Sequence, residues 1–284
     1  MRRKTRARLW GLAFIAPALC FYLLFSVYPF FKGISLAFFR ASVFGSEFTG
    51  LTNYRDMFAE PLFFRAVKNT LMFTVITAPA VTFVPFVIAV MASRLSSSYQ
   101  HFIRFAFYIP MFSAGVIISS FWKWVFHPSS GFLNKLLNIQ VAWLGTNPTA
   151  FWSIETILIF SAFGIPIILY MAKILGIPQE LIDSARIDGC SETRVAWHVT
   201  FPLMLPIVAF VAITRTIGYL QTWMMPYLLT GGGPNHGTET VVLQIYQHAI
   251  IRGRWGYGAA MGVLLMLVTV SIALIQRRVL QERT

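Results

Sequence analysis

Six long apolar runs constrain what this chain can fold into more than any other feature of it. They cover residues 9–31, 67–91, 105–126, 151–172, 203–225 and 257–276. Each is close to the roughly 20 apolar residues that an α-helix needs to cross a bilayer. Charged residues make up only 12% of the sequence, whereas soluble proteins carry about 25%. The sequence therefore predicts an all-α polytopic membrane protein with six transmembrane helices, forming a single transmembrane domain over residues 1–284.

Basic residues indicate how these helices are oriented. The first run is preceded by Arg2, Arg3, Lys4, Arg6 and Arg8. It is too long for a signal peptide and has no small-residue cleavage site after it, so we interpret it as an uncleaved span. An even number of spans places both termini on one side, where the span ends carry a moderate excess of bases. These are Arg94, Arg104, Lys173, Arg186, Arg194, Arg277, Arg278 and Arg283. We expect both termini in the cytoplasm, and this topology explains the net charge of +13 better than a nucleic-acid partner does.

No pattern in the sequence indicates catalysis by this chain. Its two cysteines, Cys20 and Cys190, lack the spacing of a metal site, and its five histidines are scattered. No Ser/His/Asp or paired-carboxylate arrangement stands out, and no G-x-x-x-x-G-K-[ST] loop is present to hold ATP phosphates. We therefore expect no catalytic residue, metal site or cofactor on this chain, and any energy from ATP must come from another chain.

A charged insert at residues 177–202 separates two of the apolar runs and faces the predicted cytoplasm. Pro178 suits the first turn of a helix, and Leu181, Ile182 and Ala185 then recur at helical spacing. Gly189 ends that helix, and Ser191 can cap a second short one. The insert is therefore predicted to form a helix–glycine–helix elbow. It is either an amphipathic hairpin at the membrane surface without a partner or a docking element for another protein.

Two predicted outer loops carry their own signals. Leu51 begins a short amphipathic helix that we expect to end near Phe64. The loop at residues 230–235 contains three consecutive glycines and a proline, which exclude both helix and strand. It is either a plain turn or a constriction or docking loop on the outer side.

One basic residue, Arg215, lies inside the fifth run, where a cation is costly and normally faces a cavity or a partner. Gly218, Tyr219 and Thr222 follow at i+3, i+4 and i+7, so we expect all four residues on one helix face. Tyr219 and Thr222 are either substrate contacts or helix-packing residues. Arg215 either touches substrate, pairs with Glu155 or pairs with a partner subunit.

The charged insert resembles the EAA loop of binding-protein-dependent ABC importer permeases. The matching residues are Ile177, Pro178, Leu181, Ala185, Asp188, Gly189, Phe201, Pro202 and Leu203. Asp183 stands where that family usually has Glu, Ser184 replaces the first Ala of the motif, and Cys190 replaces the Ala after Asp-Gly. Asp183 keeps the acid of the motif with a side chain one methylene shorter.

A second match, distant in the chain, is similar to the sugar branch of that family, the maltose-permease type. It consists of Leu229-Thr230-Gly231-Gly232-Gly233-Pro234 followed by Thr238, Tyr246, Gly256, Gly258 and Ala259-Ala260. The similarity covers nearly the whole chain. Met224 departs from the pattern, since many relatives carry Asp there.

The resemblance implies the type I ABC importer permease fold in a bacterial plasma membrane. It implies a second permease subunit, a cytoplasmic ATPase dimer that holds ATP and Mg, and a periplasmic or external sugar-binding protein. The residues it assigns to ATPase coupling are Asp183, Ser184, Ala185, Asp188 and Gly189. The resemblance, together with the shared helix face, assigns a second set of residues to substrate binding. These are Ser161, Arg215, Gly218, Tyr219 and Thr222. We expect translocation of a sugar by alternating access, and of an anionic sugar if Arg215 contacts it.

Two other functions stay open at this point. One is an ABC permease for a non-sugar solute such as glycerol phosphate or a polyamine. The other, from a different class, is a membrane-embedded enzyme or a scaffold, although the apolar runs contain few acids or histidines.

Overall fold

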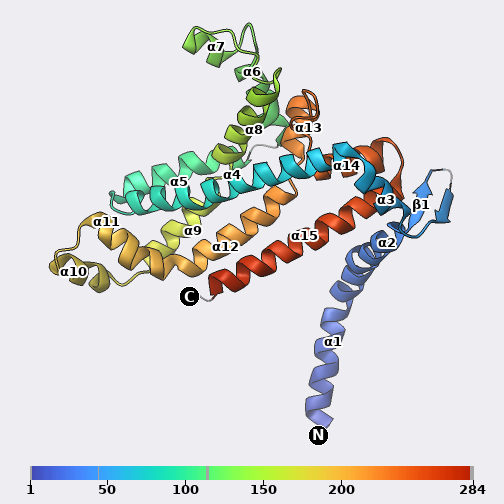
Figure 1. Cartoon of the computed structure of the whole chain (residues 1–284). Coiled ribbons are helices and arrows are strands. Elements are labelled where there is room, and N and C mark those ends of the chain that lie inside the picture. Colours follow the sequence, from blue (N-terminus) through green and yellow to red (C-terminus); the bar gives the residue numbers. More distant parts are fainter. Residues whose placement is uncertain (1, 44, 113–114, 282–284) are drawn as a thin grey trace. The chain divides into compact units, whose positions relative to one another are not determined.

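The computed structural model describes residues 2–43, 45–112 and 115–281, and it is built almost wholly of helices (Figure 1). Contacts within the chain divide it into two compact units. The first unit contains Met1–Glu60 with Ile245–Leu265, and the second contains Pro61–Gln244 with Met266–Thr284. The single domain over residues 1–284 stays a prediction.

Five helices in the described ranges are long and apolar enough to cross a membrane. They cover Phe14–Leu36, Pro61–Ala92, Asn147–Leu175, Glu192–Leu220 and Trp255–Leu280, and they match five of the six predicted runs. The remaining run, 105–126, falls on α5 (Ser97–Phe112) and α6 (Gly115–Val125). Residues 113 and 114 between these helices lie outside the described residues, so the sixth span stays a prediction.

The first unit begins with α1 (Arg2–Tyr22), which continues through a π-helical turn, η1 (Leu23–Val27), into α2 (Tyr28–Leu36). A hairpin that the sequence analysis missed follows, with β1 (Phe39–Ser42) antiparallel to β2 (Gly45–Phe48). Next comes α3 (Thr52–Ala59). The buried side-chain amide of Asn53 donates to the carbonyls of Ala37 and Phe39, both at 2.9 Å, and so fixes α3 to the hairpin.

The predicted helix from Leu51 to near Phe64 is wrong in its end point. α3 ends at Ala59, and Phe64 belongs to α4 (Pro61–Ala92). Steric conflict with a proline ring drives the preceding residue out of the helical region. Glu60 accordingly has the extended angles φ −90° and ψ 114°, and Pro61 then starts a new helix because its missing N–H costs nothing there.

The last part of the first unit packs tightly against the hairpin. It comprises η3 (Gln247–Ile251), a π-helical turn that follows α14 (Val241–Tyr246), and the start of α15 (Trp255–Gln281). A Cβ added to Gly256 would lie 1.9 Å from the carbonyl oxygen of Phe39. The hydroxyl of Tyr257 donates to Glu60 Oε2 at 2.7 Å. Glycine at position 256 therefore allows the backbone of α15 to touch the strand.

We expect Gly256→Ala to destabilise the protein. The new methyl group would meet backbone, which cannot rotate away, so the free energy of unfolding should fall by about 2 kcal/mol or more. Gly262→Ala on the same helix is the matched control, since no atom lies within 4 Å of its added Cβ. It should raise stability by roughly 0.5 kcal/mol through its better helix propensity. Thermal unfolding of the two variants in detergent measures both effects, and equal melting temperatures would contradict the packing argument.

The second unit is centred on three helices that pack on one another, α4, α9 (Gly164–Leu175) and α12 (Phe201–Leu220) (Figure 1). Phe86 on α4 is buried at their junction. Its ring lies 6.1 Å from Tyr170 on α9 and 5.4 Å from Phe201 on α12, in edge-to-face geometry. Aromatic pairs of this geometry add to the free energy that area burial alone provides. These contacts fix the membrane end of the charged insert to α4.

Two predicted runs are broken helices, because a proline removes an N–H and its ring clashes with the carbonyl four residues earlier. Run 151–172 divides into α8 (Asn147–Ser161) and α9, and Pro166 lies four residues after the break at Ala162. Run 203–225 divides into α12 and α13 (Met224–Thr230), and Pro226 lies four residues after Thr222. The freed carbonyl of Thr222 accepts a hydrogen bond from Thr240 Oγ1 at 2.7 Å.

Candidate functional site

The charged insert has the predicted elbow shape. Its arms are α10 (Gln179–Ile187) and α11 (Glu192–Val195), and η2 (Ala196–Thr200) joins α11 to α12. Gly189 adopts φ +79°, a conformation that residues with a Cβ rarely adopt, and its N–H donates to the carbonyl of Arg186 at 3.0 Å. Ser191 Oγ accepts from the N–H of Arg194 at 3.4 Å, which is the predicted cap of the second arm. The sequence therefore sets both helix ends of the elbow.

The apolar side chains of the first arm differ in their burial. Ile182 packs against the core of the second unit, and Ala185 is half-buried. Leu181 is exposed, and Ile187 is 86% exposed. Large exposed apolar side chains are typical of a surface that another protein covers.

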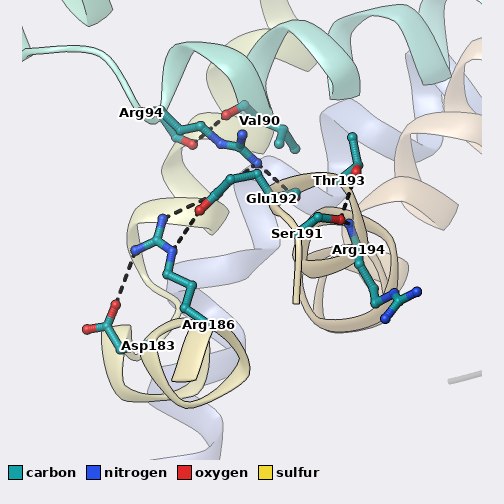
Figure 2. A network of polar contacts seen from close by, with 9 residues as sticks. Val90, Arg94, Asp183, Arg186, Ser191, Glu192, Thr193 and Arg194 are labelled. Carbon is teal, nitrogen blue, oxygen red and sulfur yellow. Dashed lines mark hydrogen bonds and ion pairs between the residues drawn. The ribbon is translucent and has the colours of Figure 1, made fainter. Parts of the chain in front are cut away.

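One ion pair joins the two arms of the elbow and a second lies within the first arm, as Figure 2 shows. Arg186 Nε lies 2.8 Å from Glu192 Oε1, and Arg186 Nη1 lies 3.2 Å from Asp183 Oδ1. The hydrogen bond to Glu192 raises the pKa of the Arg186 guanidinium. Because these side chains are about half exposed, each pair is salt-sensitive and contributes modestly to stability. Only the pair of Arg186 with Glu192 links one arm to the other.

Arg94, which the sequence suggested only as one of the bases that indicate membrane orientation, joins the elbow to the end of α4. Arg94 follows the end of α4, and its Nη2 lies 3.2 Å from Glu192 Oε2 and 3.0 Å from the Glu192 carbonyl oxygen (Figure 2). Its partner could not be read from the sequence, because Arg94 and Glu192 lie far apart in the chain. Behind this contact is a cavity of 520 Å³ between α4, α9 and the elbow. The elbow is thus braced on α4 at one point and packed on it through Phe86 at another.

The five residues assigned to coupling lie together on the first arm and at its end. Asp183, Ser184, Asp188 and Gly189 are exposed, and Ala185 is half-buried. Ser184 Oγ donates to the carbonyl of Leu181 at 3.2 Å, so it is bonded within its own helix. Asp183 accepts from both Arg186 and Gln179. Its carboxylate thus already has partners in this chain, which the sequence analysis did not foresee.

The proposed substrate face is smaller than predicted. Arg215, Gly218 and Tyr219 lie on α12, but Thr222 is beyond the end of that helix, in the turn before α13. The prediction that all four residues share one helix face is therefore wrong for Thr222, for the reason given above: Pro226 prevents α12 from continuing. The hydroxyl of Tyr219 donates to the carbonyl of Leu158 at 3.5 Å. This contact brings the face to α8, one turn before Ser161.

Arg215 does not pair with Glu155. Among the described residues, no carboxylate lies within ion-pair distance of its guanidinium. Glu155 is fully buried and instead accepts a hydrogen bond of 2.6 Å from Thr77 Oγ1 on α4. Its second carboxylate oxygen has no partner in the part of the chain that the structure describes.

Two polar contacts inside the membrane helices were missed by sequence reasoning. One is the pair of Thr77 and Glu155, and the other is the bond of 3.0 Å from the side-chain amide of Gln276 to Thr216 Oγ1 on α12. A buried carboxylate within a span is costly and usually has a role. That general rule was the available signal for Glu155, but the sequence analysis considered it only as a partner for Arg215.

The glycine-rich loop is an ordered structure fixed to the start of α4. The side-chain amide of Asn69 donates to the carbonyls of His236 and Glu239, both at 2.9 Å. Arg65 Nη1 donates to the carbonyl of Asn235 at 2.9 Å. Gly231 and Gly232 have φ of +63° and +92°, which explains the need for glycine there. Both functional alternatives for this loop, a simple turn and a constriction or docking loop, are compatible with this geometry.

Comparison with known proteins agrees with the family resemblance. Residues 63–283 match the family model described as "Binding-protein-dependent transport system inner membrane component". The chain belongs to this family. It is a transport subunit and not an enzyme, and it is a multi-pass membrane protein of the type I ABC importer permease fold.

Individual relatives cover almost all of the chain. The probable ABC transporter permease protein YurN of Bacillus subtilis (strain 168) is 31% identical over 93% of this chain and 94% of its own length. The sulfoquinovosyl glycerol transport system permease protein SmoG of Agrobacterium fabrum (strain C58 / ATCC 33970) is 30% identical over 97% of this chain and 92% of its own. Among solved structures, a chain of a bacterial ABC transporter that imports the acidic polysaccharide alginate superimposes with a TM-score of 0.88. It is 24% identical, and the match covers 98% of each chain.

Proposed function

We propose that this chain is the permease subunit of an ABC importer for an anionic sugar derivative. It works beside a second permease subunit, on a cytoplasmic ATPase dimer that holds ATP and Mg, and receives its solute from an external binding protein. The observation that carries the anionic class is Arg215, a membrane-embedded cation for which the described residues supply no carboxylate. Arg215 is partly exposed on a membrane-spanning helix, where a cation is costly without a counter-charge, and an anionic solute in transit supplies one.

The surroundings of Arg215 suit a sugar. Tyr219, one helical turn away, is buried and donates its hydroxyl to the carbonyl of Leu158, so that oxygen can still accept a hydrogen bond. Ser161 adds a partly exposed hydroxyl one turn beyond Leu158. Gly218 precedes Tyr219 on α12 and is exposed, and an added Cβ there would meet no atom within 4 Å. Free space beside a cation, an aromatic ring and hydroxyl groups is what a charged sugar requires. The relative SmoG, named for a sulfonated sugar conjugate, supports the same class.

Coupling runs through the elbow. With both termini in the cytoplasm, the elbow faces the ATPase dimer, and its exposed groups Ile187, Asp188 and Ser184 lie on the docking surface. The ion pair between Arg94 and Glu192 transmits movement of the elbow to α4. Because α4 packs on α12, this movement reaches the helix that carries the substrate face. Closure of the ATPase dimer then shifts the permease between two conformations, as alternating access requires.

Copurification and substrate-stimulated ATP hydrolysis test this proposal. We expect the tagged chain to purify with an ATPase and a second multi-span protein. We expect the external binding protein, loaded with a sugar uronate, sulfonate or phosphate, to stimulate hydrolysis at least tenfold more than with a neutral sugar. Absence of both partner chains would refute the importer assembly. Stimulation by neutral sugars alone would refute the anionic class, and stimulation by glycerol phosphate but by no sugar would favour the non-sugar alternative.

A further inference from the structure

Two cavities of opposite chemistry adjoin each other where α4 and α8 begin. The first, of 370 Å³, is lined by Arg65, Lys68 and Asn147, and its wall includes Trp152. The second, of 400 Å³, is lined mainly by the rings of Trp122, Phe126, Trp143 and Trp152. Pro148 and Trp152 line both cavities. One end of the combined site is therefore basic and the other apolar.

The basic cavity lacks a counter-charge. No carboxylate among the described residues lies within ion-pair distance of Arg65 or Lys68. One N–H of Arg65 donates to the carbonyl of Asn235. Lys68 makes no hydrogen bond within the described ranges. The two cations lie one turn apart on α4, so their charges repel unless an anion lies between them. The first turn of α8, at Asn147 and Pro148, adds a partial positive charge to the same cavity.

The apolar cavity is unsuited to a sugar. Two hydroxyls that line it already donate hydrogen bonds within the chain. Thr156 Oγ1 donates to the carbonyl of Trp152 at 2.8 Å, and Ser153 Oγ donates to the carbonyl of Trp143 at 3.3 Å. The indole N–H of Trp143 donates to Asn134 Oδ1 at 2.7 Å, which fixes that ring as a wall. A cavity whose polar groups are bonded elsewhere offers a guest only apolar contact, and hydrocarbon fits that chemistry.

The depth of the site in the membrane agrees with this chemistry. α4 has 32 residues and is about 48 Å long, whereas the hydrocarbon layer is about 30 Å thick. At least one end of α4 therefore extends beyond the hydrocarbon layer, and two bases within its first turns, Arg65 and Lys68, are typical of an end in the headgroup region. Trp152 begins the apolar run of α8, at the level where tryptophan side chains gather in membrane proteins.

We propose that the two cavities together bind one anionic phospholipid. Its phosphate lies between Arg65 and Lys68, and an acyl chain passes Trp152 into the cavity bounded by Trp122 and Trp143. This site is on the same side of the membrane as the glycine-rich loop, which Arg65 also holds. Lipid at this position would stabilise the junction of that loop with α4 and α8, whichever solute the importer carries.

Native mass spectrometry of the assembled importer, with phosphatidylglycerol or phosphatidylcholine added, tests the proposal. We expect preferential retention of phosphatidylglycerol. Arg65→Gln with Lys68→Gln should weaken it about 25-fold, because each base near an anionic lipid contributes roughly a fivefold factor. The charge-preserving pair Arg65→Lys with Lys68→Arg should retain the preference. The matched control Arg55→Gln with Lys135→Gln removes two exposed bases from other predicted outer segments and should leave retention unchanged.

Three further outcomes separate the sources of the anion. Trp152→Ala should weaken retention of long-chain phosphatidylglycerol but not the binding of inorganic phosphate. If phosphate displaces the lipid and Trp152→Ala has no effect, the site is an anion site and the lipid proposal is wrong. The proposal also fails if the Gln pair leaves lipid retention intact and instead weakens binding of the external solute-binding protein.

Discussion

Arg215→Met is expected to reduce uptake of an anionic sugar by a factor of about 10 to 150 in proteoliposomes that contain the assembled importer. That range corresponds to the roughly 1.5–3 kcal/mol that a hydrogen bond to a charged group contributes. The reason is that the described residues provide Arg215 with no carboxylate of their own, so its charge is available to the solute. Methionine keeps much of the side-chain length and apolar volume, and the change therefore removes mainly the charge.

Two variants control for this prediction. Arg215→Lys keeps the charge but loses the planar, two-pronged geometry, so uptake should fall less than in the Met variant. Thr214→Val alters the neighbouring residue on α12, whose hydroxyl donates only to the carbonyls of Phe210 and Val211 within the helix. Uptake by this variant should stay near the unaltered level. Normal uptake by Arg215→Met would remove the anionic-sugar proposal while leaving the family assignment untouched.

Gly189→Pro is expected to lower ATP hydrolysis coupled to transport by tenfold or more, with the chain still inserted in the membrane. Gly189 has φ +79°, and proline is restricted to about −65°, so the turn between α10 and α11 cannot form. The change also removes the N–H that donates to the carbonyl of Arg186. The ion pairs of Glu192 with Arg186 and Arg94 would then be lost, because they depend on the angle between the arms.

Gly189→Asn is the matched control for the elbow. Asparagine tolerates positive φ, and an added Cβ at this position meets no atom within 4 Å, so coupling should be largely retained. Asp183→Lys tests the charge network separately, since it places a second cation beside Arg186 and should also impair coupling. The docking assignment would be untenable if Gly189→Pro and Asp183→Lys both hydrolysed ATP at the normal substrate-stimulated rate.

The sequence by itself determined the features that depend on neighbouring residues. Helices long enough to cross a membrane follow from the lengths of the apolar runs, and five of the six have their counterparts in the described structure. The elbow follows from Pro178, Gly189 and Ser191, because each acts on the backbone within one helical turn. The breaks before Pro166 and Pro226 did not follow from the sequence in this way, because Pro79 and Pro85 lie inside α4 without ending it.

Only the tertiary structure decided which distant side chains meet. Glu155 bonds to Thr77 and not to Arg215, and Arg94 braces Glu192 across almost a hundred residues of chain. The two cavities that share Trp152 draw their walls from four helices and the segments between them. A short-range pattern specifies where a helix begins, ends and turns. The partner of a side chain depends on how whole helices pack and rotate against one another, and that is set by the sum of many weak contacts over the entire fold.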